Sequence, residues 1–253
     1  MLLAILGALA VGASLGLLGS GGSILTVPIL VYVLGQPDKV AIAGSLAIVG
    51  GISLFAALPF IARHQVHWRS VLLFGVPGMA GSLGGAHLAR YVSGPVQLLL
   101  FALVMLLAAF FMFRGKRPRQ ADGNAQPWWK IALDGTAVGA ITGLVGVGGG
   151  FLIVPALVIL GGLGMHLAVG SSLLIIALKS AAALWEYTGV LSSFGLALDW
   201  NVITVFTAVG TAGSFAGRLL GRRLDQATLQ RAFAVFLVVI GAFVLWQNAP
   251  ALS

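Results

Sequence analysis

The chain has 253 residues, of which 59% are hydrophobic and only 8% charged, and its formal net charge is +8. Soluble domains carry about 25% charged residues, so this composition excludes an ordinary water-soluble protein. Cysteine is absent, which excludes disulfides, thiolate metal sites and cysteine nucleophiles. Several uncharged runs approach or exceed the roughly 20 residues that cross a bilayer. The sequence therefore predicts an all-α polytopic membrane protein.

The first apolar segment is interrupted by glycines in the stretch GLLGSGGSILTVPIL, residues 16–30. We expect one apolar helix over 2–18 and a second over 23–34, separated by the GSGG break. The N-terminus lacks the basic region of a signal peptide and its equivalent recurs in mid-chain, so we interpret it as mature structure. Three uninterrupted helices follow, at about 40–62, 70–91 and 95–113.

A polar linker, RGKRPRQADGNAQPWWK, occupies residues 114–130 and contains five basic residues. Basic residues gather in the cytoplasmic loops of membrane proteins, so we place this linker in the cytoplasm. The same rule explains the positive net charge without a nucleic-acid partner. The linker separates a first transmembrane repeat, 1–113, from a second, 131–253.

The second repeat has its own interrupted segment, GLVGVGGGFLIVPAL, at 143–157. An offset of 127 aligns residues 11–46 with 138–173 without a gap, with 17 identities in 36 pairs. The match resumes at an offset of 132, where GMAGS at 78–82 aligns with GTAGS at 210–214. Because glycine and proline stay in register, the chain is an internal duplication. The uninterrupted helices of the second repeat are predicted at about 167–190, 200–221 and 227–247.

Each interrupted segment has two interpretations. A single kinked helix would cross the bilayer and give eight crossings with parallel repeats, whereas a re-entrant hairpin would leave six crossings and inverted repeats. Loop charge favours the hairpins, because that arrangement leaves mainly Lys39 and Arg90 outside. The basic residues that it places inside are those of the linker together with Arg63, Arg69, Arg222 and Arg223. We therefore prefer inverted repeats.

Paired breaks inside apolar segments are typical of a ligand site. Irregular backbone survives in a bilayer only against protein or a hydrated cavity. A helix that resumes after a break presents unpaired N–H groups and a positive dipole end, which suit an anion. Breaks at corresponding positions of two repeats indicate a transporter's substrate site near the midplane. The candidate substrate-binding residues are Ser20, Gly21, Gly22, Ser23, Ser45, Gly146, Gly148, Gly149, Gly150, Ser171, Ser172 and Lys179.

Other glycines are predicted to serve helix packing, because small residues four apart let two helices approach closely. At Gly22 and Gly149 we instead expect a positive φ or a close approach of the ligand. Valine at either position should abolish transport, whereas valine at Gly143 should mainly loosen helix contacts. The predicted packing pairs are Gly12 with Gly16, Gly81 with Gly85, Gly139 with Gly143, and Gly213 with Gly217.

Isolated polar residues in the apolar helices are further candidates. Lys179 lies in the middle of such a helix, where a charge costs about 2.5–3.5 kcal/mol on insertion scales. Its alternative role is a structural ion pair with Glu186, seven residues later. Ser45 and the pair Ser171–Ser172 are either helix N-caps or hydroxyl donors to the substrate. Arg218 is either a site residue or a side chain that snorkels to the interface.

The segments GLLGSGGSILTVPIL and GLVGVGGGFLIVPAL, each followed about 15 residues later by AGSL or GSSL, resemble the sulfite exporter TauE/SafE family of membrane transporters. The resemblance extends over essentially the whole chain, and its motif is specific for the family but not for the substrate. It implies transport of sulfite, a sulfonate or a related anion across a bacterial-type inner membrane. The first repeat departs slightly, with Ser20 and Ser23 where the second has Val147 and Gly150.

The function expected from these observations is a secondary transporter for a small sulfur-containing anion, without cofactor, metal or catalytic residues. A proton or sodium coupling ion, downhill movement and the oligomeric state stay open. An anion channel of the same architecture and a non-transporting membrane scaffold are the alternatives. An intramembrane enzyme is disfavoured, because the sequence contains no HExxH, no cysteine and no obvious pair of carboxylates within the apolar segments.

Overall fold

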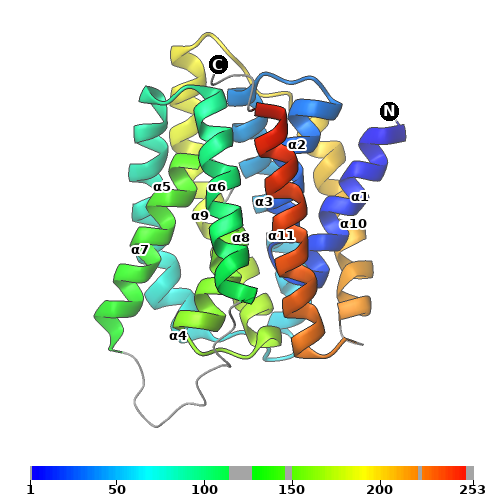
Figure 1. Cartoon of the computed structure of the whole chain (residues 1–253), viewed down its shortest axis with the longest axis vertical. Coiled ribbons are helices and arrows are strands. Elements are labelled where there is room, and N and C mark those ends of the chain that lie inside the picture. Colours follow the sequence, from blue (N-terminus) through cyan, green and yellow to red (C-terminus); the bar gives the residue numbers. More distant parts are fainter. Residues whose placement is uncertain (1, 114–126, 146–149, 222–223, 249–253) are drawn as a thin grey trace.

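The computed structural model describes residues 2–113, 127–145, 150–221 and 224–248, and this part of the chain is helical without any strand (Figure 1). The helices correspond closely to the predicted ones, which confirms the all-α class. They are α1 (Leu2–Leu18), α2 (Gly21–Pro28), α3 (Asp38–Ile61), α4 (Trp68–Ser70), α5 (Val76–Leu88), α6 (Gly94–Phe113), α7 (Trp128–Val145), α8 (Gly150–Pro155), α9 (Met165–Ser193), α10 (Trp200–Gly221) and α11 (Gln226–Asn248).

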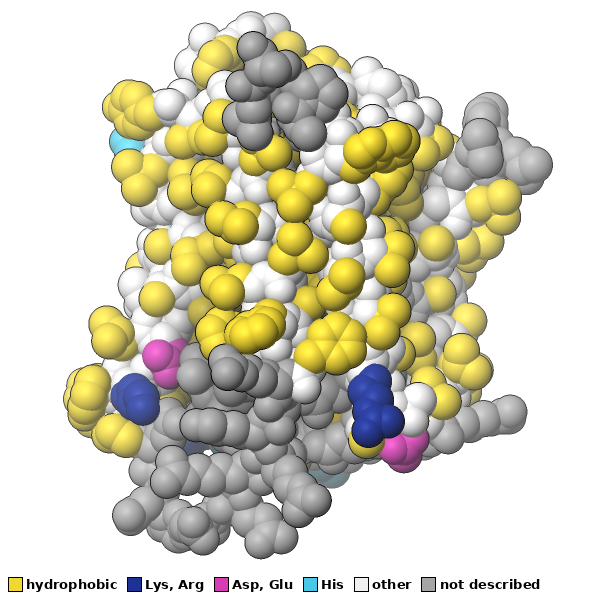
Figure 2. Space-filling view, in the orientation of Figure 1, with side chains coloured by type: hydrophobic (Ala, Val, Ile, Leu, Met, Phe, Trp, Pro, Cys, Tyr) yellow, Lys and Arg dark blue, Asp and Glu magenta, His cyan; other side chains and the backbone are white. Residues whose placement is uncertain are grey.

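The outer surface is that of a multi-pass membrane protein. Within the described residues, five helices are long and apolar enough to cross a bilayer, namely α3, the run Trp68–Tyr91, α6, α9 and α10. Large apolar side chains such as Leu107 and Leu219 are exposed on these helices. In Figure 2 hydrophobic side chains cover the middle of the visible face, and its Lys, Arg, Asp and Glu side chains lie toward the lower end. Such a surface needs lipid around it.

Both interrupted segments end in the same irregular helix. Pro28 and Pro155, which are repeat equivalents, close α2 and α8, and each is followed by five residues of π-helix, η1 (Ile29–Val33) and η4 (Ala156–Leu160). A proline inside a helix lacks an N–H and displaces the carbonyl four residues earlier, so the hydrogen bonds beyond it shift register. The two aligned prolines are therefore followed by the same backbone conformation.

Glycines bring two helix pairs into backbone contact. A Cβ built at Gly12 or Gly16 of α1 would overlap the backbone of Gly210 or Ser214 on α10. On the other pair, α5 with α7, a Cβ at Gly143 would overlap the backbone of Ser82. The remaining members of the predicted packing pairs also face backbone atoms of the neighbouring helix, which confirms that interpretation.

Helices of one half pack mainly against helices of the other half. The main contacts join α1 with α10, α5 with α7, α3 with α9 and α6 with α11, and α2 also touches α8. By the repeat offsets, α1 corresponds to α7 and α10 to α5, so the α1–α10 contact is the equivalent of the α5–α7 contact. Each of the other pairs joins a helix to its own repeat equivalent. In Figure 1, α6 ends at the lower end of the molecule, where α7 and α11 begin.

The predicted linker differs from the structure at its end. We predicted 114–130, but α7 begins at Trp128, so the two tryptophans and Lys130 belong to the helix. Residues 114–126 lie outside the described part of the chain. An apolar helix that starts with two exposed tryptophans is typical of a segment anchored at the membrane interface.

Candidate functional site

The break between α1 and α2 lies inside the protein. Gly19 has φ +75°, a conformation that favours glycine, and Ser20 precedes the first residue of α2 without capping it through its side chain. Ser20 and Ser23 are completely buried. The Ser23 hydroxyl donates to the Ser20 carbonyl at 2.7 Å. The Ser20 hydroxyl has no hydrogen-bond partner among the described residues.

The start of α8 lies against this break. A Cβ built at Gly150 would lie 2.9 Å from the Ser23 hydroxyl and 2.8 Å from Cδ1 of Ile176 on α9. The beginnings of α2 and α8 therefore meet, as a substrate site formed by the paired breaks requires. Three further candidates, Gly146, Gly148 and Gly149, lie outside the described residues.

Helix α9 holds the first break in place. The Ser172 hydroxyl donates to the Gly19 carbonyl at 3.0 Å and to the Val169 carbonyl at 2.8 Å. A Cβ built at Gly19 would lie 2.8 Å from the Cα atom of Val169, so Gly19 packs directly against the backbone of α9. The structure thus brings together Gly19, which we had not proposed, with four predicted residues. These break-cluster residues are Gly19, Ser20, Ser23, Gly150 and Ser172.

Two predicted site glycines, Gly21 and Gly22, pack against α1 and not against α8 or α9. A Cβ at Gly22 would overlap the Leu15 side chain and the Val11 carbonyl of α1, and Gly21 lies against Ser14. The positive φ is at Gly19 and not at Gly22, so the expectation of a positive φ at Gly22 is wrong. Gly22 lies where α2 packs closely against α1, which leaves no room for a side chain.

The hydrogen bonds of Ser45 and Ser171 differ from that of Ser172 to the first break. The Ser45 hydroxyl donates to the Ile42 carbonyl within its own helix at 2.8 Å. The Ser171 hydroxyl accepts the backbone N–H of His67 at 2.8 Å, which fixes the loop before α4 onto α9. Neither serine is an N-cap, because α3 and α9 are preceded by Pro37 and Gly164, so that alternative is wrong.

Lys179 is buried and unpaired. Its side chain is 1% exposed, and its Nζ has no hydrogen-bond partner among the described residues. The stem lies along α5, with Cδ 3.2 Å from a Cβ built at Gly78. Lys179 does not join the break cluster directly, since Ile176, one turn earlier, is the α9 residue that contacts Gly150.

The alternative role of Lys179, an ion pair with Glu186, is wrong. The Glu186 carboxylate accepts instead from Nδ1 of His87 at 2.9 Å and from the guanidinium of Arg90. Seven residues separate Lys179 from Glu186 along one helix face, but the carboxylate turns toward the end of α5 and the segment after it. Lys179 is left without a counterion among the described residues.

Two serines of the central helices were missed. Ser53 on α3 and Ser180 on α9 are completely buried, and their hydroxyls have no partner among the described residues. Ser180 packs on α3 at Gly50, where a built Cβ would lie 3.0 Å from it. The two serines are 127 residues apart, so the repeat offset was the signal that identified them as a pair.

A polar network fills one end of the bundle, where α3 and α6 begin. The Lys39 ammonium donates to the carbonyls of Ala89 and Val92 and to the Gln97 side-chain oxygen, at 2.6–2.7 Å. The Gln97 amide donates to the Tyr187 hydroxyl at 2.9 Å. We predicted Lys39 in an outside loop, but it is 8% exposed in the first turn of α3. The network therefore closes this end.

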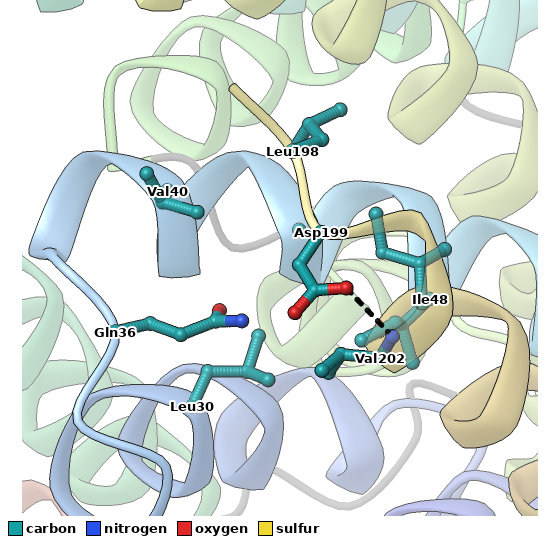
Figure 3. A pocket seen from close by; sticks show the side chains of 9 residues that line it. Leu30, Gln36, Val40, Ile48, Leu198, Asp199 and Val202 are labelled. Carbon is teal, nitrogen blue, oxygen red and sulfur yellow. Dashed lines mark hydrogen bonds between the residues drawn. The ribbon is translucent and has the colours of Figure 1, made fainter. Parts of the chain in front are cut away.

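A narrow crevice lies beside the start of α10 (Figure 3). Asp199 caps α10 by accepting the N–H groups of Asn201 and Val202 at 3.0 and 3.1 Å. In Figure 3 its carboxylate and the Gln36 amide face the same space. The acidic lining does not suit an anion. His67, 132 residues before Asp199, occupies the equivalent capping position at α4.

His67 accepts the N–H of Ser70 through Nδ1 at 3.3 Å. Burial and, to a smaller extent, the charge of Arg69 lower the pKa of His67. The neutral imidazole keeps a lone pair for this cap, whereas the protonated ring would have none.

The chain is similar in sequence to known membrane transporter proteins. The chain is 31% identical to a "Probable membrane transporter protein" of Xylella fastidiosa, over 96% of this chain and 94% of that one. It is 26% identical to the "Probable membrane transporter protein YunE" of Bacillus subtilis, over 98% of both chains. No solved structure matches.

A family model described as "Sulfite exporter TauE/SafE" matches residues 4–244. This is a family of membrane transporters and not of enzymes. Because the match runs through both halves of the helical bundle, the chain belongs to the sulfite exporter TauE/SafE family.

Proposed function

We propose that the chain transports a small sulfur-containing anion, sulfite or an organosulfonate, which binds near the bilayer midplane at the break cluster. The observation that supports this most is the presence of buried donors without acceptors, the Ser20 hydroxyl and the Lys179 ammonium. Buried polar groups are almost always hydrogen-bonded, so a ligand with acceptor oxygens would complete these two. Sulfite and sulfonates offer three such oxygens on one sulfur atom.

The backbone adds donors of the same kind. The first N–H groups of a helix have no partner in the helix and attract negative charge. α2 begins at Gly21 beside Ser20, and α8 begins at Gly150 beside Ser23. An anion between the two beginnings would accept from both. Lys179, about one turn beyond the residue that contacts Gly150, would supply the opposite charge from the same helix.

The proposed framework is a pair of inverted repeats with re-entrant hairpins, α1 with α2 and α7 with α8. Three observations support it: α1 has 17 residues, fewer than the roughly 20 that cross a bilayer, contacts are exchanged between repeat equivalents, and α6 and α11 run in opposite directions in Figure 1. The end at which α7 begins would then face the cytoplasm, because the basic linker precedes it. A bacterial-type inner membrane would be its location.

Single cysteines in this cysteine-free chain test the topology. Pro37→Cys, beside Lys39, and Asp225→Cys, between α10 and α11, both occupy exposed positions. With inverted repeats, an impermeant thiol reagent added outside intact cells should label the first and not the second. Labelling of both from outside would rule out the inverted arrangement and favour eight crossings.

Proteoliposomes loaded with unlabelled sulfite test the function. External radiolabelled sulfite should accumulate by counterflow, with inhibition by ethanesulfonate. A channel would give flux without counterflow, and a scaffold would give none. Gly19→Ala should lower this transport strongly, because the new methyl would meet Val169 and Ser172.

Gly35→Ala is the matched control for this variant. Gly35 also has a positive φ, +66°, but a Cβ there meets nothing within 4 Å. Both variants carry similar backbone strain, so a difference in transport per folded molecule comes from the crowding at the break and not from the strain. Equal transport by the two variants would argue against the break cluster as the substrate site.

A further inference from the structure

A second polar pocket lies at the end of the bundle where α1 and α10 finish. It is lined by the last turns of α1, α3 and α10, by the loop before α4, and by the start of α9. Its volume of about 30 Å³ is room for roughly two water molecules, at ~10–15 Å³ each. The lining residues with polar or aromatic side chains are Phe60, Gln65, His166 and Arg218.

Arg218 is the charged group of this pocket. Its guanidinium carbon lies 5.7 Å from the centre of the Phe60 ring, a distance at which the ring face stabilises the cation. Its Nε is buried and has no hydrogen-bond partner among the described residues. No carboxylate lines the pocket. A guanidinium whose Nε is free, and which has no counterion among the described residues, is suited to an oxyanion.

The equivalent place in the other half is closed. The repeat offsets convert His166 into Lys39, Phe60 into Tyr187 and Arg218 into Ala86. There the Lys39 ammonium and the Tyr187 hydroxyl join Gln97 in the network described above, and the space is filled. Two related sets of helices thus form an open cationic pocket at one end and a closed network at the other.

The pocket adjoins the break cluster. Val169 and Gly16 line the pocket, and Val169 also lies directly against Gly19. One turn of α9 separates His166 from Val169, and three further residues lead to Ser172, which holds the Gly19 carbonyl. An ion in the pocket would therefore be separated from the break by a single layer of residues.

We propose that the Arg218 pocket binds a small oxyanion and is the access site for the break cluster on the linker side of the membrane. This proposal rests on the proposed anion transport. Arg218 donates to the anion, and Gln65 and His166 supply further polar contacts. The same chemistry would fit the phosphate of a lipid headgroup, so the experiment separates the two sources.

Gln65→Cys provides a reporter in the pocket that does not depend on transport. In phospholipid-free maltoside detergent, its labelling rates with an anionic (ethylsulfonate) and a cationic (trimethylammonium) methanethiosulfonate reagent are compared. Cationic clefts raise the local concentration of anions by about 10-fold or more, so the anionic reagent should be favoured. Ethanesulfonate should slow the labelling, and an equal concentration of chloride should not.

Matched variants locate the effect. Arg218→Met in the Gln65→Cys background should remove the anionic preference and the protection, whereas Arg218→Lys should keep the preference. Lys130→Met, which removes an exposed cation at the start of α7, should change neither. Gln36→Cys, in the crevice with Asp199, should show no anionic preference. Elution as a single species checks the fold of each variant.

Three outcomes would overturn the proposal. One is an unchanged rate ratio in Arg218→Met, and another is absence of protection by ethanesulfonate in the detergent. The third is protection only by added phosphatidylglycerol, which would identify a lipid site. Each of these outcomes would contradict the pocket proposal without affecting sulfite counterflow by the wild type. Absence of sulfite counterflow would contradict the proposed transport, but it would not change the labelling result for the pocket.

Discussion

Gly85→Val is expected to reduce the yield of folded protein more than any other single substitution considered for this chain. A Cβ at Gly85 of α5 would overlap the Ala140 carbonyl and approach the Leu144 nitrogen of α7 at 2.6 Å. These are backbone atoms inside a helix, which cannot move aside as a side chain can. Overpacking costs about 1–3 kcal/mol or more, and here it would separate the helices along their whole contact.

The adjacent residue is the control. A Cβ at Gly84 meets nothing within 4 Å, because this position faces away from α7. Gly84→Val adds the same side chain to the same helix, so it removes helix propensity and hydropathy as explanations. Thermal unfolding in detergent, followed by size-exclusion chromatography, should show Gly84→Val close to the wild type. Similar losses in both variants would mean that the close α5–α7 contact does not determine stability.

Lys179→Met is expected to abolish most transport while leaving the protein at least as stable as the wild type. Charge-assisted hydrogen bonds contribute about 1.5–3 kcal/mol, so loss of the ammonium should weaken anion binding by about 10- to 100-fold. Methionine has a similar length and no charge to bury. Since the ammonium has no partner among the described residues, its removal leaves no orphaned acceptor there.

Ile52→Met is the matched control for Lys179→Met. Ile52 is the repeat equivalent of Lys179, and it packs against Gly210 as Lys179 packs against Gly78. Sulfite counterflow and melting temperature are measured for both variants. Normal transport by Lys179→Met, or a drop in its melting temperature as large as that of a core mutation, would assign the lysine to structure.

The helices could be predicted from sequence because each depends on local properties. Length and hydropathy set the uninterrupted helices, and the repeat offset transferred each boundary from one half to the other. The packing glycines were also predictable, because a spacing of four residues places them on one helix face. Each of these features can be recognised in the sequence without knowing how the helices pack in three dimensions.

The partners of polar side chains could not be predicted in this way. Glu186 was considered as a partner of Lys179 because they share a helix face, yet it bonds to Arg90, 96 residues earlier. The role of Gly22 depends on how α2 packs against α1, and that of Ser171 depends on the loop before α4. Such contacts are decided by the arrangement of helices, which a single sequence does not specify.

The pairing of α1 with α10 has a consequence for synthesis of the chain. α1 is made first, but the glycine face that receives it, on residues 200–221, is made near the end. α5 is likewise made before its partner α7, which follows the linker. The first half alone therefore leaves two small-residue faces uncovered in the lipid, although it contains a complete set of repeat helices. An ancestral protein of one repeat would therefore have needed a second copy of itself to cover these faces. In the present chain the linker joins both halves, so each newly made chain contains the helices that cover them.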